Sequence, residues 1–101
     1  MAKLYIEEWG NVRIDNNGHL APVPHDLLAR TQLDIGATST RTSFAFEENT
    51  RYVIIHAEAK AFILFGDNTV IATTNGIIMP RGAFRSFGLM PSWEYVAVIE
   101  G

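Results

Sequence analysis

The chain contains no cysteine, which excludes disulfides and thiolate zinc sites as sources of stability. Its 101 residues are the size of one domain. A domain of that size buries a modest share of its surface on folding, and small domains commonly gain further stability from partner chains. We therefore expect residues 1–101 to form a single domain that associates with other polypeptides.

Charge is also scarce. Charged residues make up 19% of the chain and apolar residues 48%, whereas an average domain is about 25% charged. Low charge on a small domain implies that apolar surface remains exposed. Lysine occurs only at Lys3 and Lys60, and the other basic residues are arginines. A surface rich in arginine and poor in lysine is typical of protein–protein interfaces, although drift in a lysine-poor genome explains the bias equally well.

Basic runs and long hydrophobic runs are absent as well. The net charge is −3, without a cluster of Lys and Arg, which argues against a nucleic-acid partner. The apolar stretches are too short to span a membrane, and Glu7 and Glu8 interrupt the first of them, so no signal peptide is predicted. We expect neither nucleic acid nor membrane as a partner, and a soluble product that is intracellular or assembled inside a cell.

What the chain does contain is a series of short, strand-like segments separated by Gly, Asn and Pro. Residues 51–58 are the clearest, and because they are apolar on both faces we expect a central strand covered on both sides. Further strands are predicted at residues 4–6, 12–14, 42–46, 60–65, 70–72, 77–79, 84–87 and 94–100. Residues 27–35 fit a short helix or a strand, and the alternation of Thr31, Leu33 and Ile35 favours the strand.

Roughly eight to ten short strands at close spacing predict an all-β domain. We expect a jelly-roll-like antiparallel β-sandwich, with a small Greek-key barrel as the alternative. Residues 15–26 are predicted to form a Pro-containing arm or connector, because Pro22 and Pro24 remove ladder donors and favour an extended path. Such a stiff apolar segment loses little entropy when it lies across a neighbouring subunit.

The sequence predicts no catalytic, cofactor or metal site. His56 and Glu58 share a strand face, but one such pair supplies too few ligands for zinc, and a hydrogen-bonded structural histidine is the better interpretation. The serines lack a nucleophile-elbow context, and adjacent glutamates on a strand point to opposite faces. The glycines stand singly, without a phosphate-binding loop. We therefore expect a protein that is not an enzyme.

Several residues are instead suited to binding. Trp9 and Trp93 lie beside turns, where they either anchor a partner or cap the core, with capping slightly favoured. Phe84 and Phe87 alternate with Arg81 and Arg85 in a pattern found in interface cores. The predicted protein-interface residues are Trp9, Leu20, Pro22, Val23, Pro24, His25, Arg81, Phe84, Arg85 and Trp93.

Several motifs resemble small virion proteins of tailed phages. The longest is FEENTRYVIIHA at residues 46–57, an Asn-Thr-Arg turn followed by an apolar strand that ends in His-Ala. It continues with FGDN at 65–68, MPRG at 79–82, FGLMP at 87–91 and AVI at 97–99. The match covers the C-terminal half, with APVP at 21–24 as weaker support. These are turn-and-strand patterns without catalytic content.

The resemblance implies a capsid decoration, or cement, protein. Related head proteins look like jelly rolls that pair as dimers and clamp neighbouring capsid subunits. The implied partners are a second copy of the chain, in a homodimer or cyclic oligomer, and the phage major capsid protein. The implied location is the capsid exterior, after assembly in the host cytoplasm. A comparable fold also fits a tail, a portal or a fibre base, and the alternative function is a carbohydrate- or receptor-binding module that uses Trp9 or Trp93 as a stacking platform.

Overall fold

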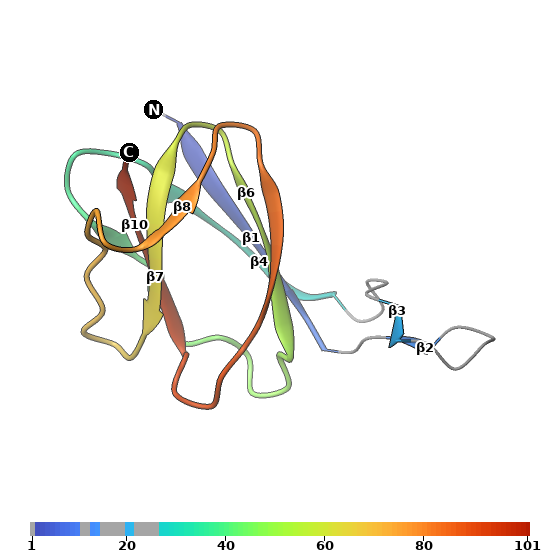
Figure 1. The fold of residues 1–101 in the computed structure, drawn as a ribbon. Coiled ribbons are helices and arrows are strands. Elements are labelled where there is room, and N and C mark those ends of the chain that lie inside the picture. Colours follow the sequence, from blue (N-terminus) through green and yellow to red (C-terminus); the bar gives the residue numbers. More distant parts are fainter. Residues whose placement is uncertain (1, 11–12, 15–19, 22–26) are drawn as a thin grey trace.

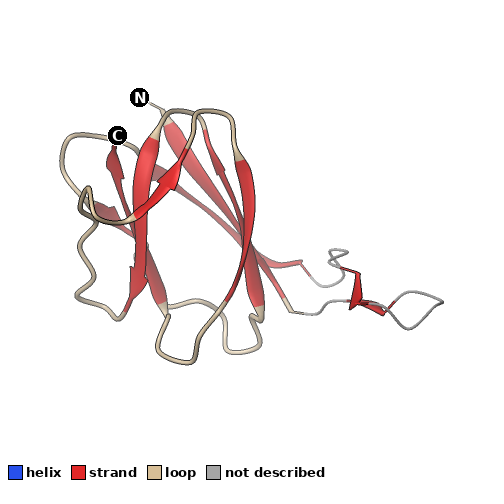
Figure 2. Ribbon diagram, in the orientation of Figure 1, coloured by secondary structure: helices blue, strands red, loops and turns tan. Residues whose placement is uncertain are grey.

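The computed structural model describes residues 2–10, 13–14, 20–21 and 27–101, and all of their regular structure is β-strand (Figure 2). The ten strands are β1 (Lys3–Trp9), β2 (Arg13–Ile14), β3 (Leu20–Ala21), β4 (Leu27–Asp34), β5 (Thr40–Arg41), β6 (Tyr52–Ala57), β7 (Ala61–Gly66), β8 (Ile77–Met79), β9 (Phe84–Gly88) and β10 (Tyr95–Glu100). In this part of the chain no helix is long and apolar enough to cross a membrane.

Eight of the strands form two antiparallel four-stranded sheets, which pack face to face as a β-sandwich (Figure 1). Sheet I has the order β4-β1-β6-β9, and sheet II has the order β5-β10-β7-β8. The short strands β2 and β3 pair with each other, outside both sheets. The predicted all-β antiparallel sandwich is confirmed.

The strand order is that of a jelly roll whose last strand stands at the start of the chain. A jelly roll has eight strands, lettered B to I, in sheets of order B-I-D-G and C-H-E-F. If β4 to β10 are lettered B to H, both orders are reproduced, with β1 in the place of strand I. The central position of β1 in sheet I explains why Leu4 and Ile6 of the N-terminal segment KLYIEEW are buried in the core.

The core lies between the two sheets and follows from alternation along the strands. In β7, Ala61, Ile63 and Phe65 are buried, whereas the residues between them are half-buried or exposed. The largest fully buried side chains are Leu4, Ile6, Ile55, Ile63, Met79, Val53, Val96 and Val98, and both sheets contribute to them. Each such side chain stabilises the fold by about 1.5–3 kcal/mol through its removal from water.

The strand interpretation of residues 27–35 is confirmed. Strand β4 pairs with β1 along its whole length, with one register shift beside Trp9. Leu33 and Ile35 are buried, as their alternation with polar residues predicts. The N–H of Ile35 donates to the carbonyl oxygen of Ala2 at 2.9 Å, which extends the pairing beyond the end of the strand.

The predicted strand at 42–46 is wrong. Thr42 N donates to the carbonyl oxygen of Val96, near the start of β10, and Phe46 N donates to that of Glu94, just before β10. The chain bends between Thr42 and Phe46. This bend turns Phe44 outward, where it is 84% exposed, whereas Phe46 packs against the core. The two phenylalanines therefore lie on different sides, although their spacing suggests one strand face.

The predicted strand at 70–72 is also wrong. The side chain of Asp67 accepts hydrogen bonds from the N–H and hydroxyl of Thr69, which sets up a turn after β7. These bonds lower the pKa of Asp67. The N–H of Ala72 then donates to the Ser39 hydroxyl at 2.8 Å, so this segment reaches across to the β5 side of the sandwich and pairs with a side chain instead of a strand.

Most of the predicted arm lies outside the described residues. Residues 15–19 and 22–26 belong to the undescribed part, and with them the predicted interface residues Pro22, Val23, Pro24 and His25. The remaining arm residues, Leu20 and Ala21, make up β3, in which Leu20 pairs with Ile14 of β2.

Strand β6 occupies a central position, as predicted, but its cover differs from the prediction. It lies between β1 and β9 in sheet I, and Val53, Ile55 and Ala57 are fully buried against sheet II. Its outward-pointing Ile54 and His56 are half-buried, and neither four-stranded sheet packs on that side. Among the described residues the outer side of β6 is therefore covered only in part, with Tyr52 buried and Ile54 and His56 half-buried, so the predicted cover on both sides is not complete there.

Candidate functional site

A row of side chains crosses the outer side of sheet I. The register places Tyr5 of β1 opposite Gln32 of β4 and His56 of β6. It also places His56 opposite Phe84 of β9. Residues that face one another in an antiparallel sheet project to the same side and interact. We name Tyr5, His56 and Phe84 the aromatic row.

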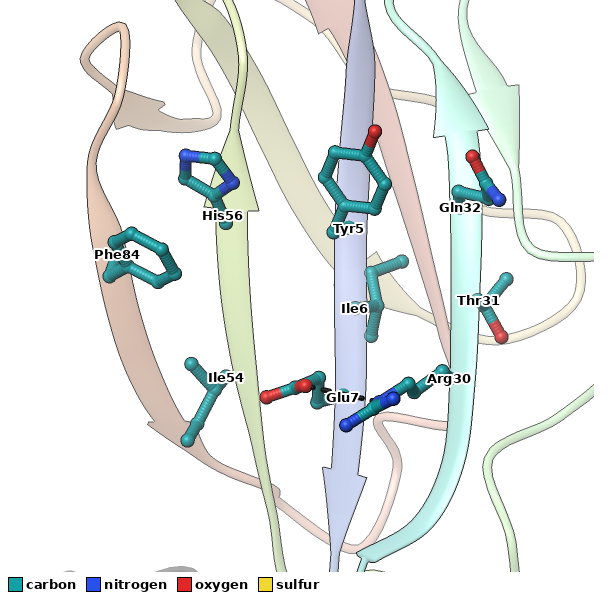
Figure 3. A pocket seen from close by; sticks show the side chains of 9 residues that line it. All are labelled: Tyr5, Ile6, Glu7, Arg30, Thr31, Gln32, Ile54, His56 and Phe84. Carbon is teal, nitrogen blue, oxygen red and sulfur yellow. Dashed lines mark ion pairs between the residues drawn. The ribbon is translucent and has the colours of Figure 1, made fainter.

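The three rings of the aromatic row are stacked (Figure 3). The centroids of His56 and Phe84 are 4.2 Å apart with an interplanar angle of 9°, and those of Tyr5 and His56 are 6.0 Å apart with an angle of 15°. These separations follow from a strand spacing of about 4.8 Å. The row is open at its β9 end, where Phe84 is 71% exposed. When a partner covers an exposed aromatic row, apolar area is removed from water and the complex is stabilised.

A second row runs beside the aromatic row. Glu7 of β1 lies opposite Arg30 of β4 and Ile54 of β6. Arg30 Nε is 3.2 Å from Glu7 Oε2, and the two side chains are drawn together in Figure 3. An ion pair this exposed contributes at most about 1 kcal/mol to stability. Its importance here is that it neutralises both charges of the row.

Lys3 and Asp34 form another ion pair on the same side of sheet I. The hydrogen bond from the Lys3 ammonium, together with its charge, lowers the pKa of Asp34, and Asp34 in turn raises the pKa of Lys3. Both groups therefore stay charged at neutral pH. The two ion pairs, Lys3–Asp34 and Arg30–Glu7, neutralise four of the charges on this side of sheet I, and Glu58 lies beside Lys3.

A depression of about 420 Å³ lies among these side chains. Its lining consists of Tyr5, Ile6, Glu7, Arg30, Thr31, Gln32, Ile54, His56 and Phe84 (Figure 3). Aromatic and aliphatic carbon, one arginine and few unpaired charges are the composition of the centre of a protein–protein interface. The size also suits a small polar ligand.

Of the predicted interface residues, Phe84 lies in this depression. Tyr5, Arg30, Ile54 and His56 were not among the predicted residues, because strand register alone brings them together from distant parts of the chain. One signal for them was present in the sequence: residues 51–58 are apolar on both faces, and a single sandwich covers one of them.

Trp9 lies on the same side of sheet I, opposite Tyr52 of β6. Trp9 is half-buried and Tyr52 is 6% exposed. Within the described part of the chain, Trp9 Nε1 and the Tyr52 hydroxyl are buried without a hydrogen-bond partner. Burial raises the pKa of Tyr52. Trp9 therefore contributes to this side of the sheet as a packed side chain.

The two predicted arginines lie elsewhere. Arg81 is exposed in the turn between β8 and β9. Arg85 projects to the other side of β9, where its guanidinium carbon is 5.1 Å from the centroid of Phe87 and its Nη1 donates to the carbonyl oxygen of Ile78 at 3.5 Å. The predicted arginine–aromatic cluster is therefore formed by Arg85 and Phe87, whereas Phe84 points to the opposite side of the strand.

Trp93 closes one end of the sandwich. Its ring stacks on Phe65, with centroids 4.9 Å apart and an angle of 10°. Phe65 also lies beside Phe46 and Phe87, at 6.4 Å and 5.3 Å, and all three neighbours of Phe65 pack against the core. This is the capping arrangement that the sequence favoured, and one face of the Trp93 ring is occupied by Phe65.

Several acidic side chains in the described residues have structural partners. Glu58 Oε1 accepts the N–H of Lys3 at 2.8 Å, so Glu58 is turned to the backbone of β1. Over residues 2–10, 13–14, 20–21 and 27–101, no three His, Asp or Glu side chains gather as metal ligands. The outer side of sheet I offers stacked rings, apolar contact, hydrogen-bonding groups and two ion pairs.

A comparison of the chain with protein-family models, with curated proteins and with solved structures found no match.

Proposed function

We propose that this protein is a structural, non-enzymatic protein of a tailed-phage virion. It decorates the capsid exterior, where it bridges neighbouring major capsid subunits and reinforces the shell, and it acts as a homodimer or a cyclic homo-oligomer assembled in the host cytoplasm. The motifs in residues 46–57 and in the C-terminal half support the virion assignment by resemblance. The outer side of sheet I supports a role in docking on another protein.

One observation carries the docking role. The two central strands of sheet I, β1 and β6, present Tyr5, Ile54 and His56 outward, and within the described residues these side chains are exposed or half-buried. Antiparallel sheets with one solvated face normally alternate apolar-in and polar-out. An outward face that breaks this alternation is typical of a surface that another protein covers.

The charges of this face fit the same role. Removing an unpaired charge from water is costly, whereas hydrogen-bonded ion pairs are buried more cheaply. Arg30 and Glu7 already form such a pair beside the aromatic row. Tyr and Arg are also the residue types that dominate binding energy in interfaces. We therefore place the centre of the docking surface between Tyr5, Arg30 and Ile54.

The test adds purified protein back to phage heads assembled without it and measures binding by co-sedimentation. Tyr5→Lys places an unpaired charge in the docking surface, and we expect it to weaken binding by at least about tenfold. Leu64→Lys is the matched control, because Leu64 is equally exposed, at 37%, but projects from the outer side of sheet II.

The proposal predicts that Leu64→Lys binds as the unmodified protein does and restores the resistance of the heads to heat. If both variants bind normally, or if Leu64→Lys alone loses binding, the outer side of sheet I is not the docking surface. If the unmodified protein fails to bind the heads at all, the capsid assignment is wrong.

A second candidate function is a carbohydrate- or receptor-binding module of a virion tail or fibre. The depression of about 420 Å³ favours it, because stacked rings lie there beside the side chains of Gln32, Arg30 and Glu7. This location differs from the tryptophans that the sequence suggested as platforms. Binding to a glycan array that disappears in Phe84→Ala would support it, and silence on the array together with unchanged host adsorption would dispose of it.

A further inference from the structure

Strand β9 forms an open edge of sheet I. Among the described strands it pairs only with β6, and four of its five residues are exposed. Edge strands are usually protected by lysine, proline or a bulge. The segment Phe84–Gly88 contains neither residue type, its register with β6 is regular, and its single charge, on Arg85, is turned onto Phe87.

The ladder with β6 determines which backbone groups lie at the open edge. Leu89 N donates to the Arg51 carbonyl oxygen at 3.1 Å, and Ala57 N donates to the Ala83 carbonyl oxygen at 3.2 Å. Hydrogen-bonded and non-bonded pairs alternate in an antiparallel ladder, so residues 85 and 87 also face β6. The N–H and C=O groups of residues 84, 86 and 88 therefore point away from the sheet and are open to another strand.

We propose that β9 pairs with β9 of a second copy of this chain, antiparallel, about a two-fold axis at Ser86. In this register Ser86 faces Ser86 of the second copy, and Phe84 faces Gly88 of the second copy. These are pairs of residues whose backbone groups point outward. Each pair therefore exchanges two N–H···O bonds in the normal antiparallel pattern.

The side chains of the strand FRSFG are complementary in the same register. The space above Gly88 is open, with no atom within 4 Å of the position that a Cβ would take, and the 71% exposed ring of Phe84 of the second copy fits over it. An aromatic ring that covers a cross-strand glycine is a known stabilising pair. Arg85, already 5.1 Å from its own Phe87 ring, gains Phe87 of the second copy as its cross-strand neighbour, a second cation–π contact.

This pairing would join the outer sides of the two copies of sheet I. Trp9, Tyr52 and Gly88 stand opposite one another in one copy. In the proposed register Gly88 lies opposite Phe84 of the second copy, so this row continues directly into the aromatic row of that copy. The inference deepens the proposed function, since it names the strand and the register through which a second copy binds, and it rests on that function only for what the joined surface binds.

The test introduces a charge of either sign at Ser86. This residue is exposed and touches no part of the core. Ser86→Lys and Ser86→Glu each place like charges opposite one another at the two-fold axis. By sedimentation velocity over roughly 1 µM to 1 mM, we expect the unmodified protein to dimerise and each variant to associate at least about a hundredfold more weakly. An equimolar mixture of the two variants should form a heterodimer.

Two further variants separate the strand pairing from the charge. Ser86→Pro removes the outward N–H without touching the ladder to β6, whereas Ser86→Ala keeps it. We expect the proline variant to be monomeric, with an unchanged circular dichroism spectrum, and the alanine variant to dimerise. An unmodified protein that stays monomeric over the whole range overturns the inference, as do charge variants that dimerise normally or fail to form the heterodimer.

The outcome of this dimerisation test does not depend on whether the protein docks on phage heads. Tyr5→Lys leaves β9 unchanged, so it should dimerise even though it no longer binds phage heads. A dimer that binds no head contradicts the capsid assignment alone, whereas a monomer that binds heads contradicts the β9 pairing and the homo-oligomeric state and leaves the capsid assignment standing. Pairing of β9 with a strand of another protein would show itself as a heteromeric complex without self-association, which also overturns the inference.

Discussion

At the scale of single residues, Glu7 and Glu8 show how far alternation along a strand predicts structure. Their adjacency predicts that they point to opposite faces. Glu7 points outward and pairs with Arg30, whereas Glu8 points inward and is 5% exposed. What the sequence does not predict is the partner of the buried acid: Glu8 Oε1 accepts hydrogen bonds from Glu47 N at 2.7 Å and from the Thr50 hydroxyl at 2.8 Å. Glu8 therefore fastens the loop before β6 to strand β1.

Removal of the Glu8 carboxylate should destabilise the fold. Glu8→Ala leaves the N–H of Glu47 and the hydroxyl of Thr50 without their acceptor, and we expect a loss of about 1–3 kcal/mol in the free energy of unfolding. Urea denaturation measures it. Glu48→Ala is the matched control, because Glu48 is exposed in the same loop. A loss for Glu8→Ala no larger than for Glu48→Ala would show that the two hydrogen bonds do not hold the loop.

At the scale of elements, the sequence predicts strands well where alternation coincides with the core. Strand β4 follows from the alternation around Leu33, and β6 from its run of β-branched residues. The two wrong strand predictions, at residues 42–46 and 70–72, have a common cause. Both segments have strand-like composition, but their hydrogen bonds go partly to side chains and to isolated backbone groups. Composition cannot show whether a neighbouring strand is present to complete a ladder.

The turn between β8 and β9 depends on one glycine. Ala83 N donates to the Pro80 carbonyl oxygen at 3.0 Å, and Gly82 has a φ of 77°. A β-turn with positive φ at its third residue is of type II and favours glycine there. A Cβ at Gly82 would meet no atom within 4 Å, so a substitution is opposed by backbone strain alone.

We expect Gly82→Ala to lower the free energy of unfolding by about 1 kcal/mol, since alanine disfavours the left-handed region. Thermal or urea denaturation measures the change. Gly82→Asn should lose less, because asparagine tolerates positive φ better. Equal stability of the alanine variant and the unmodified protein would contradict the assignment of a strained turn at this position.

At the scale of the whole molecule, the sequence predicts that part of the surface is suited to protein binding, but it does not predict which part. Low charge and a strand that is apolar on both faces indicate exposed apolar area. The identity of the binding residues depends on strand register, which brings Tyr5, His56 and Phe84 together on one side of sheet I. Register arises from the packing of both sheets, so residue spacing alone could not reveal this row.

The outer side of sheet II is the natural competitor for the docking role. Leu64, Ile71 and Ile78 are 37%, 65% and 46% exposed on or beside it. Among the described residues it has no stacked ring system like that of sheet I, and the segment after β7 reaches over to its β5 side. Two apolar sides on one small sandwich mean that the docking surface is best identified in the assembled state.

The central claim is that another protein covers the outer side of sheet I in the virion. Hydroxyl-radical footprinting of the free protein and of the protein bound to phage heads tests it most directly. We expect the oxidation of Tyr5 and His56 to fall on the order of tenfold on binding, while that of Ile71 and Ile78, both exposed on or beside the outer side of sheet II, stays unchanged. Protection of Ile71 or Ile78 with unaltered oxidation of Tyr5 and His56 would contradict the claim.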